Sequence, residues 1–566
     1  MKAGLGPFVH GAGLQVSTGR FIEMGVTSQI RDEAFQSVGQ WIGDPSAVSF
    51  GPLSAELVLR SLRQQTNIVH DRVGRQVGLA FGAIQTRGDA SHPLLGALPP
   101  LYPEWLGDRG FIESQGLRFA YVGGSMARGI GSANLVIALA EMGALGMFGS
   151  AGLPVAQVES AIDLMSGALD QRLLPWGCNL IHSPGEPGLE DHLVDLFLRR
   201  GVRRVEASAF MRLTKAVVRY ACTGLREDSD GRVVRPRSLF AKVSREEIAE
   251  LFLSPAPQAL LAELQTEGAL SVQEVNLASR IPLADNLIVE SDSGGHTDNR
   301  PLGSLFPVIV RLSNRLSAKY GYTQQVYLGA AGGMGTPDAL ASAYSMGAAF
   351  VVLGTVHQAA VESGVSEDAR EMLARAGPAD VAMTASADMF EMGVKVQVLT
   401  RGTLMAARGN QLYQLYKAHR SIEDIPDAAR AKLESDIFRL PLEEIWTRTR
   451  AFFASDTAQI ARAEADPKHK MALLFRWYLG NSSRWPLVGE EDRRIDYQVW
   501  CGPAMGAFNR WAAGSFLESP QERRVQQVAL NLLEGAAVTT RAHQLRTYGL
   551  DVPGAAFCHQ PEELQL

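Results

Sequence analysis

Between residues 118 and 355 the chain repeats one pattern eight times. Each unit has a short apolar run, then a glycine-rich or polar turn, and most are followed by an amphipathic helical stretch. Strands that alternate with helices predict a parallel sheet, and eight units over roughly 240 residues match the size of a (β/α)8 TIM barrel. An open doubly wound sheet is the alternative. The apolar runs are "FAYVGG" near residue 119, "ALGMFGS" near 144, "LPWGCNL" near 174, "VRRVEASA" near 202, "SLFAKV" near 238, "NLIVES" near 286, "QVYLGA" near 325 and "AFVVLGT" near 349.

The regions on either side of the repeat predict two further domains. Residues 1–117 contain an amphipathic stretch, "LSAELVLRSLRQQTNIVHD", and a proline-rich segment, "SHPLLGALPPLYPEW", typical of a small N-terminal domain and a connector. The first 50 residues carry no functional signal. Residues 118–364 form the barrel, and residues 365–566 form a helical C-terminal domain. That helical domain is expected to cover the barrel mouth, form a substrate tunnel or build an oligomer interface.

Composition excludes several classes of protein. The 566 residues are 46% hydrophobic and carry a formal charge of -6, which is unlike a disordered chain or a nucleic-acid-binding protein. The four cysteines are far apart and predict neither a zinc site nor a disulfide framework, so a reducing cytoplasm is expected. No export signal is expected at the start, and glycines interrupt the long apolar stretch from Ala133, which favours a buried helix and strand over a membrane span. We interpret Cys178 as barrel packing.

The loops after the seventh and eighth strands indicate a phosphate site. Gly332 and Gly333 let the backbone approach a ligand closely, and the Thr-Pro pair at 336–337 starts the following helix. Gly354 and Thr355 close the site from the eighth strand. Barrels often hold a phosphate between these two loops. The alternative is that the glycines only turn the chain.

The ligand suggested by these loops is flavin mononucleotide (FMN). The chain has no G-x-x-x-x-G-K-[ST] motif, and its glycines at 329–335 lack a ribose-binding acid at the usual distance. FMN is therefore favoured over ATP or a dinucleotide held by a Rossmann fold. Gly124, Ser125 and Met126, after the first strand, would place backbone beside the isoalloxazine ring.

Five strand-end motifs resemble the flavin-dependent nitronate monooxygenase superfamily: "GGSMA", "CNLIHS", "ESDSGGHTDNRP", "GAAGGMGTP" and "VLGT". Three later motifs resemble the PfaD-type, trans-acting enoyl reductases of polyunsaturated fatty acid and trans-acyltransferase polyketide synthases: "ADMFEMGVKVQVLTRGTLMAARGNQLYQLY", "RWYLGNSSRW" and "DYQVWCGPAMGAFNRW". The resemblance covers roughly residues 85–550, and the later motifs are the more specific ones.

The resemblance implies reduction of an α,β-unsaturated thioester held on an acyl carrier protein. FMN would be the bound cofactor and NADPH or NADH the hydride donor, with hydride passing to the β-carbon. His296 is the implied catalytic residue, as donor to the thioester oxygen and as proton source for the α-carbon, because an imidazole titrates near neutral pH. Gly294 and Gly295 would keep side chains away from the flavin.

Five further residues are candidates with alternatives left open. Glu290 and Ser293 are candidate flavin contacts. Asn179 is a candidate flavin contact or a turn cap, and His182 orients substrate or is an ordinary exposed histidine, the interpretation we favour. Lys395 contacts cofactor or thioester, or forms an ion pair with a nearby acid, Glu391 or Asp388.

Charged residues outside the strand ends are harder to assign. Asp292, Asp298 and Arg300 form a second layer around the His296 loop or, as we favour, pair locally to stabilise it. A carrier protein is acidic, so a basic docking patch is expected, although such residues usually form a solvated face. The candidates are Arg232, Arg235, Arg237 and Lys242, or Arg199, Arg200, Arg203 and Arg204.

Two other functions remain open. One is a nitronate monooxygenase-like FMN oxidase, which the long C-terminal region disfavours. The other is a non-catalytic, flavin-binding subunit of a synthase, which the presence of His296 and both glycine loops disfavours. Neither requires a metal ion, a nucleic acid or a membrane.

Overall fold

The computed structural model describes residues 37–565, apart from residues 86, 187 and 455. The chain folds into two compact units. One comprises residues up to Pro100 together with Leu545–Pro553, and the other comprises Leu101–Gln544 together with Gly554–Leu566. Most of the first 50 residues, for which we predicted no functional signal, lie outside the described part.

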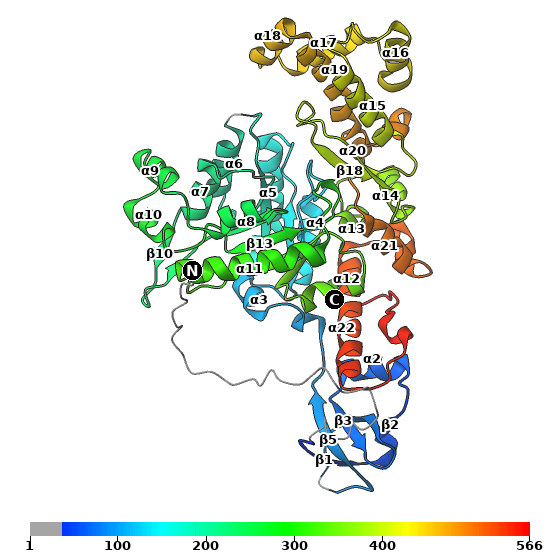
Figure 1. Ribbon diagram of the computed structural model, residues 1–566. Helices are drawn as coiled ribbons and strands as arrows, with labels where there is room; N and C mark the ends of the chain where they lie inside the picture. The colour runs from blue at the N-terminus through cyan, green and yellow to red at the C-terminus, as the bar shows by residue number, and fades with distance from the viewer. Residues whose placement is uncertain (1–36, 86, 187, 455, 566) are drawn as a thin grey trace, which may run out of the picture. The chain divides into compact units, whose positions relative to one another are not determined.

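Eight parallel strands close into a barrel in the second unit (Figure 1). They follow one another around the barrel in chain order, and β16 pairs with β6 through Val351 and Tyr121. The TIM barrel is therefore confirmed, and the open sheet is wrong because no strand is left at an edge. The strands are β6 (Tyr121–Gly123), β7 (Leu145–Phe148), β8 (Trp176–Ile181), β9 (Arg204–Ser208), β12 (Ser238–Val243), β13 (Asn286–Glu290), β15 (Tyr327–Ala331) and β16 (Phe350–Leu353).

Helices connect the strands as the alternating pattern predicts. In the apolar stretch from Ala133, Ser132 caps α4 (Ala133–Met142) and Gly143 ends it with a φ of 90°, a conformation that glycine adopts freely. No helix within the described residues is long and apolar enough to cross a membrane. The other connecting helices are α5 (Val155–Leu169), α6 (Leu189–Arg199), α7 (Lys215–Cys222), α8 (Glu246–Leu253), α11 (Leu302–Tyr320), α12 (Pro337–Ser345) and α13 (Thr355–Gln358).

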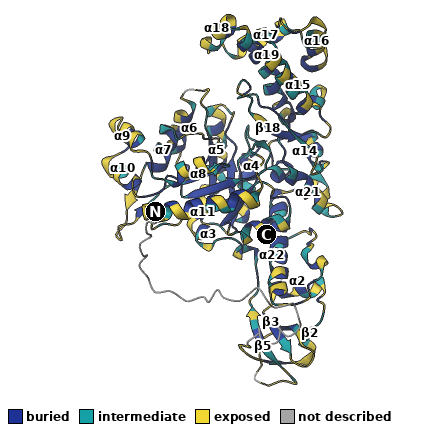
Figure 2. Cartoon of the chain, viewed as in Figure 1, coloured by how far each residue is buried: buried dark blue, intermediate teal, exposed yellow. Residues whose placement is uncertain are grey.

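At the amino-terminal ends of its strands, the barrel interior is apolar and is closed by a helix that precedes the first strand. Phe111, on α3 (Arg109–Gln115), stacks on Phe350 with ring centroids 4.2 Å apart. Both side chains are fully buried, and the barrel strands form the dark core in Figure 2. Because α3 packs into the barrel, the compact unit begins at Leu101, whereas we placed the domain boundary at residue 117.

The first unit contains a five-stranded antiparallel sheet in the order β1-β5-β3-β4-β2. The first half of the proline-rich segment, which we predicted to be a connector, lies in strand β5. Pro93 lies where β5 has a partner strand on one side only, since it pairs with Gln40 of β1 and the pairing of β5 with β3 ends at Leu94. The elements are β1 (Gly39–Gly43), β2 (Val48–Phe50), α2 (Ala55–Arg63), β3 (Thr66–Asp71), β4 (Gln76–Phe81) and β5 (Ala90–Leu98).

The region after the barrel is mainly helical but contains two strands that we did not predict. β17 (Val381–Ala385) and β18 (Lys395–Leu399) pair antiparallel, and β18 also pairs with the two-residue strand β14 (Gly295–His296). The period-two alternation of "VKVQVL" is the signal for β18. The principal helices are α14 (Glu367–Ala374), α15 (Met405–Ala418), α17 (Leu442–Phe452), α18 (Thr457–Ala465), α19 (Pro467–Ser482), α21 (Pro503–Ala512) and α22 (Val525–Thr547).

Candidate active site

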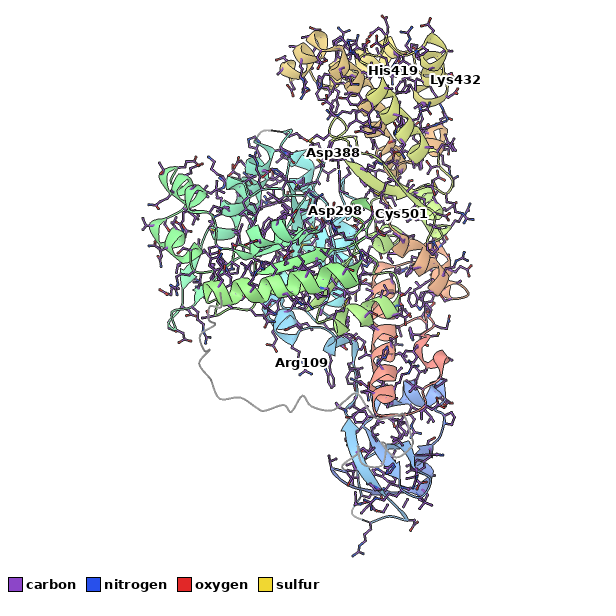
Figure 3. The ribbon with its side chains drawn as sticks, viewed as in Figure 1. Arg109, Asp298, Asp388, His419, Lys432 and Cys501 are labelled. Carbon is purple, nitrogen blue, oxygen red and sulfur yellow. The ribbon has the colours of Figure 1, made fainter. Side chains whose placement is uncertain are left out.

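His296 lies on a loop that the C-terminal region holds in place. The loop follows β13, and its strand β14 pairs with β18 through His296 and Val396. The Nε2 atom of His296 is 3.4 Å from a carboxylate oxygen of Asp388. Asp388, labelled in Figure 3, lies in the segment between β17 and β18. Partial burial raises the pKa of Asp388, but the nearby His296 outweighs it, and the pKa falls to about 2. Asp388 is therefore ionised at neutral pH.

A polar network stiffens the same loop. Gln397 on β18 donates from its side-chain amide to Asp292 (2.8 Å) and to the carbonyl of Ser293 (2.7 Å). Asn299 donates to Asp292 as well, at 2.8 Å. Asp292 therefore links both ends of the loop to β18. This agrees with the role that we favoured for Asp292, local stabilisation of the loop.

Asp298 anchors the loop to the preceding βα unit. Arg245 donates to both of its carboxylate oxygens, at 2.8 and 2.9 Å, and Ser244 donates at 2.7 Å. The hydrogen bond from Arg245 is the main reason that the pKa of Asp298 falls to about 2. Arg245, which the sequence did not single out, is the ion-pair partner of Asp298.

The two glycines of the loop have different reasons to be glycine. A Cβ atom on Gly294 would lie 2.8 Å from the backbone nitrogen of Cys501, within the motif "DYQVWCGPAMGAFNRW". Gly295 has a φ of +80°, which strains other residues. Gly294 is therefore required by its close approach to the backbone of Cys501, a reason that the sequence did not reveal.

Charged side chains occupy the barrel interior toward the carboxyl ends of the strands. The Nζ atom of Lys242 lies 3.3 Å from Glu206 and 3.6 Å from Glu290. Glu206 is fully buried and accepts hydrogen bonds from the backbone and the hydroxyl of Ser125, at 3.1 and 2.7 Å. The Ser293 hydroxyl donates to Glu290 at 3.3 Å. These residues therefore connect the loops after β6 and β13 through the barrel interior.

The pKa values in this layer reflect its burial. Burial raises the pKa of Glu290, and the charge of Lys242 opposes that rise. Burial alone would lower the pKa of Lys242, but the charges of Glu290 and Glu206 outweigh it and raise the pKa. Lys242 thus stays protonated, and its placement in a basic docking patch is wrong because it points into the barrel. Strand alternation in "SLFAKV" could have revealed this, since Phe240 faces the interior core and Lys242 shares its face.

Asn179 is buried and ties β8 to β9. Its amide donates to the Ser208 hydroxyl at 2.7 Å and to the Glu206 carbonyl at 3.0 Å. Cys178 is fully buried, and burial raises its pKa, as expected for barrel packing.

Two remaining candidates differ from our expectation. The His182 side chain is only 7% exposed, with Nδ1 2.8 Å from Glu190, so the exposed histidine that we favoured is wrong. It also stacks on Phe210. Lys395 is exposed and forms no ion pair within the described part of the chain. The two acids considered for it are engaged elsewhere, Asp388 with His296 and Glu391 with His469 at 2.9 Å.

The glycine loops after β15 and β16 have the expected local structure. Gly332 and Gly333 have φ values of +83° and +71°, and the space beside Gly333 is open. Thr336 caps α12, accepting from Ala339 at 3.4 Å, and Pro337 is in its first turn. Gly354 precedes α13, which begins at Thr355.

Most of the other basic residues considered for docking have partners. Arg199 and Arg200 pair with Glu159, Arg204 donates to Gln115, and Arg237 donates to the carbonyl of Thr223. Within the described residues, no group of three or more histidine, cysteine, aspartate or glutamate side chains is placed to hold a metal ion.

Two family profiles match the chain. The one described as "Nitronate monooxygenase" matches residues 117–429, which is more than half of the sequence. The second, described as "[Acyl-carrier-protein] S-malonyltransferase, inserted helical domain", matches residues 419–497.

The chain is similar to components of lipid and polyketide synthases. One polyunsaturated fatty acid synthase polypeptide of Thraustochytrium sp. is 46% identical, over 81% of this chain and 31% of that protein. Polyketide biosynthesis protein PksE of Bacillus subtilis is 40% identical, over 77% of this chain and 56% of that protein. The chain thus spans less than a third of the length of the first of these curated relatives and just over half of the second.

A solved structure shares the fold at higher coverage. The enoyl reductase domain of MlnA, from the macrolactin biosynthesis cluster of Bacillus amyloliquefaciens, is 37% identical. The match covers 78% of this chain and 99% of that domain, with a TM-score of 0.75. The chain belongs to the nitronate monooxygenase family, in its branch of PfaD-type enoyl reductases.

Proposed function

We propose that this protein is an FMN-dependent enoyl reductase that acts in trans on acyl-carrier-protein-bound polyketide or fatty acyl intermediates, with NADPH or NADH as reductant. The observation that carries the proposal is the pairing of His296 with Asp388 at the carboxyl ends of the barrel strands. Active sites of TIM barrels form at this end. The similarity to the MlnA enoyl reductase domain supports the reaction type.

The residues present suit FMN. Gly333 has a left-handed backbone conformation, and the space beside it is open. Together with Gly332 it belongs to the loop after β15, and Gly354 and Thr355 belong to the loop after β16; these two loops are suited to the phosphate of FMN. Backbone of Gly124, Ser125 and Met126 would lie along the ring. Lys242, the cation of the buried layer, would stabilise negative charge on the ring; Glu290 and Ser293 are its neighbours.

When bound, FMN supplies a centre that accepts hydride from the nicotinamide and delivers hydride to the enoyl β-carbon. Addition of hydride at that carbon moves negative charge to the thioester oxygen, where a preorganised donor is most effective. His296 donates a hydrogen bond to this oxygen and supplies the proton to the α-carbon. Asp388, with a carboxylate oxygen 3.4 Å from the Nε2 atom, orients the imidazole.

The carrier-protein partner is supported by the nature of the relatives, which are named as synthase and polyketide biosynthesis proteins. A cytoplasmic location is part of the same proposal. His182, Asn179 and Lys395 have a weaker claim to direct roles, because the first two are occupied by protein contacts and the third is exposed.

Three additions to the purified protein test this proposal. A visible flavin spectrum is recorded, NADPH is added without oxygen, and a crotonyl thioester on a carrier protein follows. We expect the spectrum to bleach with NADPH and to recover with the thioester as the saturated product forms. Recovery only with oxygen or a nitronate would replace the proposal by a monooxygenase. Absence of bound flavin would refute the assignment of both glycine loops.

A further inference from the structure

Asp388 lies at the tip of a hairpin whose second strand pairs with the strand of His296. The hairpin consists of β17 and β18, and residues 386–394 connect them. The N–H of Ser386 donates to the carbonyl of Val394 at 3.0 Å, which closes the base of the tip. Because β18 also pairs with β14, which carries His296, the position of the tip decides whether Asp388 reaches the imidazole.

Two helices of the C-terminal region hold the tip through one aromatic side chain. Phe390 is buried, and three other rings surround it. The ring centroids of Tyr413 and Tyr416, on α15, lie 5.5 and 5.1 Å from that of Phe390, and the centroid of Phe475, on α19, lies 6.2 Å away. The two helices pack against each other (Figure 1). The hairpin tip is therefore anchored on α15 and α19.

The next residue, Glu391, provides a polar anchor. Its carboxylate lies 2.9 Å from the Nδ1 atom of His469, on α19, and 3.7 Å from a guanidinium nitrogen of Arg462, on α18. His469 is buried, and its Nε2 atom lies 2.8 Å from the side-chain oxygen of Gln459, also on α18. Both ring nitrogens of His469 are thus engaged, so its orientation is fixed and it joins the tip to two helices.

The two acids of the tip face different partners. Asp388 and Glu391 are three residues apart, and they lie beside His296 and His469 respectively. The side chain of Asp388 is 57% exposed, so the surrounding side chains do not enclose it. Its place beside His296 therefore depends on the backbone of the tip, which Glu391 and Phe390 hold.

We propose that Glu391 is a positioning residue of the candidate active site: its pairing with His469 holds the hairpin tip so that Asp388 stays beside His296. The inference rests on the proposed function, in which His296 is the donor to the thioester oxygen. A misplacement of about 1 Å can lower a rate by about a hundredfold. His469 lies within residues 419–497, the region similar to an inserted helical domain, so this region would support catalysis in the barrel.

Variants of Glu391 test the anchor with little risk to the fold, because its side chain is partly exposed whereas that of His469 is buried. Glu391→Ala removes the anchor, and Glu391→Gln keeps an oxygen that can accept from the imidazole. Glu444→Ala is the matched control, since Glu444 lies on α17 and pairs with Arg448 at 2.5 Å. The parameters kcat and KM for enoyl reduction and the thermal midpoint are measured for each variant, alone and combined with Asp388→Asn.

We expect kcat to fall at least fivefold in Glu391→Ala, while KM for crotonyl carrier protein and for NADPH stays within twofold. Glu391→Gln should recover most of this loss, and Glu444→Ala should stay within twofold of the unchanged protein. Added to Asp388→Asn, Glu391→Ala should lower kcat by less than a further twofold, because a positioning residue acts only through the group that it positions. An equal fall with and without Asp388→Asn would overturn the inference.

Hydrogen exchange separates this inference from the proposed function. Deuterium uptake is followed by mass spectrometry in peptides that cover residues 386–394, in the flavin-loaded protein without substrate. We expect uptake at least fivefold faster in Glu391→Ala than in Glu444→Ala, because opening of the tip breaks the hydrogen bond between Ser386 and Val394. Equal uptake in the two variants would overturn the inference whatever the activity. Faster uptake in a protein that does not reduce the enoyl thioester would support the anchor and refute the proposed function alone.

Discussion

Replacement of Lys242 by methionine should destabilise the barrel in a pH-dependent way. The change keeps an unbranched side chain but removes the only cation found within 4 Å of Glu206 and Glu290 among the described residues. Glu206 would remain fully buried, with Ser125 as its remaining side-chain donor. Two neighbouring buried carboxylates without a cation repel one another and resist ionisation.

The magnitude follows from the distances. At an effective dielectric constant of about 20, two unit charges 3.3 Å apart attract by roughly 5 kcal/mol, and the desolvation of Lys242 cancels part of this. Removal of one partner of a buried ion pair typically costs about 3–5 kcal/mol. An unfolding entropy of about 2.1 cal/mol/K per residue, over a unit of roughly 450 residues, converts this loss to a midpoint about 3–5 °C lower.

The pH dependence has a definite sign. Without Lys242, the carboxyl pKa values in the folded state rise above their unfolded values, so the folded state binds more protons and loses stability as the pH rises through that interval. The difference between Lys242→Met and the unchanged protein should therefore be largest near pH 8 and smaller near pH 5.

The assay is thermal unfolding at both pH values, with FMN at the same saturating concentration because a ligand raises the midpoint. Adding Glu290→Gln to Lys242→Met should recover part of the loss, since it removes one of the two carboxylates. A loss of equal size at pH 5 and pH 8, or a further loss on adding Glu290→Gln, would refute the reasoning.

Three further predictions concern the His296 loop. His296→Gln should lower kcat for enoyl reduction by about 10²–10⁴-fold while flavin content stays unchanged; a variant with full activity would remove His296 from the mechanism. Asp388→Asn should lower kcat for enoyl reduction, because the carboxylate 3.4 Å from the Nε2 atom of His296 orients the imidazole; an unchanged kcat would contradict the pairing. Gly294→Ala should lower the thermal midpoint more than Gly333→Ala, because a Cβ atom on residue 294 would lie 2.8 Å from a backbone nitrogen and one on residue 333 would contact nothing. The opposite order would show that the space around the Cβ atom does not determine the loss of stability.

Local patterns were sufficient to predict the barrel. Each apolar run specifies its own strand, alternation with helices predicts a parallel sheet, and the number of units favours a closed barrel over an open sheet. The same patterns located the His296 loop and the glycines at 332 and 333, because chemistry in this fold gathers where strands end. They failed in the first unit, where the proline-rich segment suggested a connector, because a proline is tolerated in the part of a strand that has a partner on one side only, and the sequence does not show where that part lies.

The composition of the site was decided by tertiary structure. The sequence by itself determined the eightfold alternation, the glycine loops and the place of His296, since these depend on propensities within a few residues of one another. Only the folded chain brought Asp388 to His296, Cys501 to Gly294 and Lys242 between Glu206 and Glu290. These partners are far apart in the chain or on different strands, and their meeting depends on barrel closure and on the packing of β18 against the loop. Lys242, which we considered for a surface patch, points into the barrel and is the partly buried cation of the candidate active site.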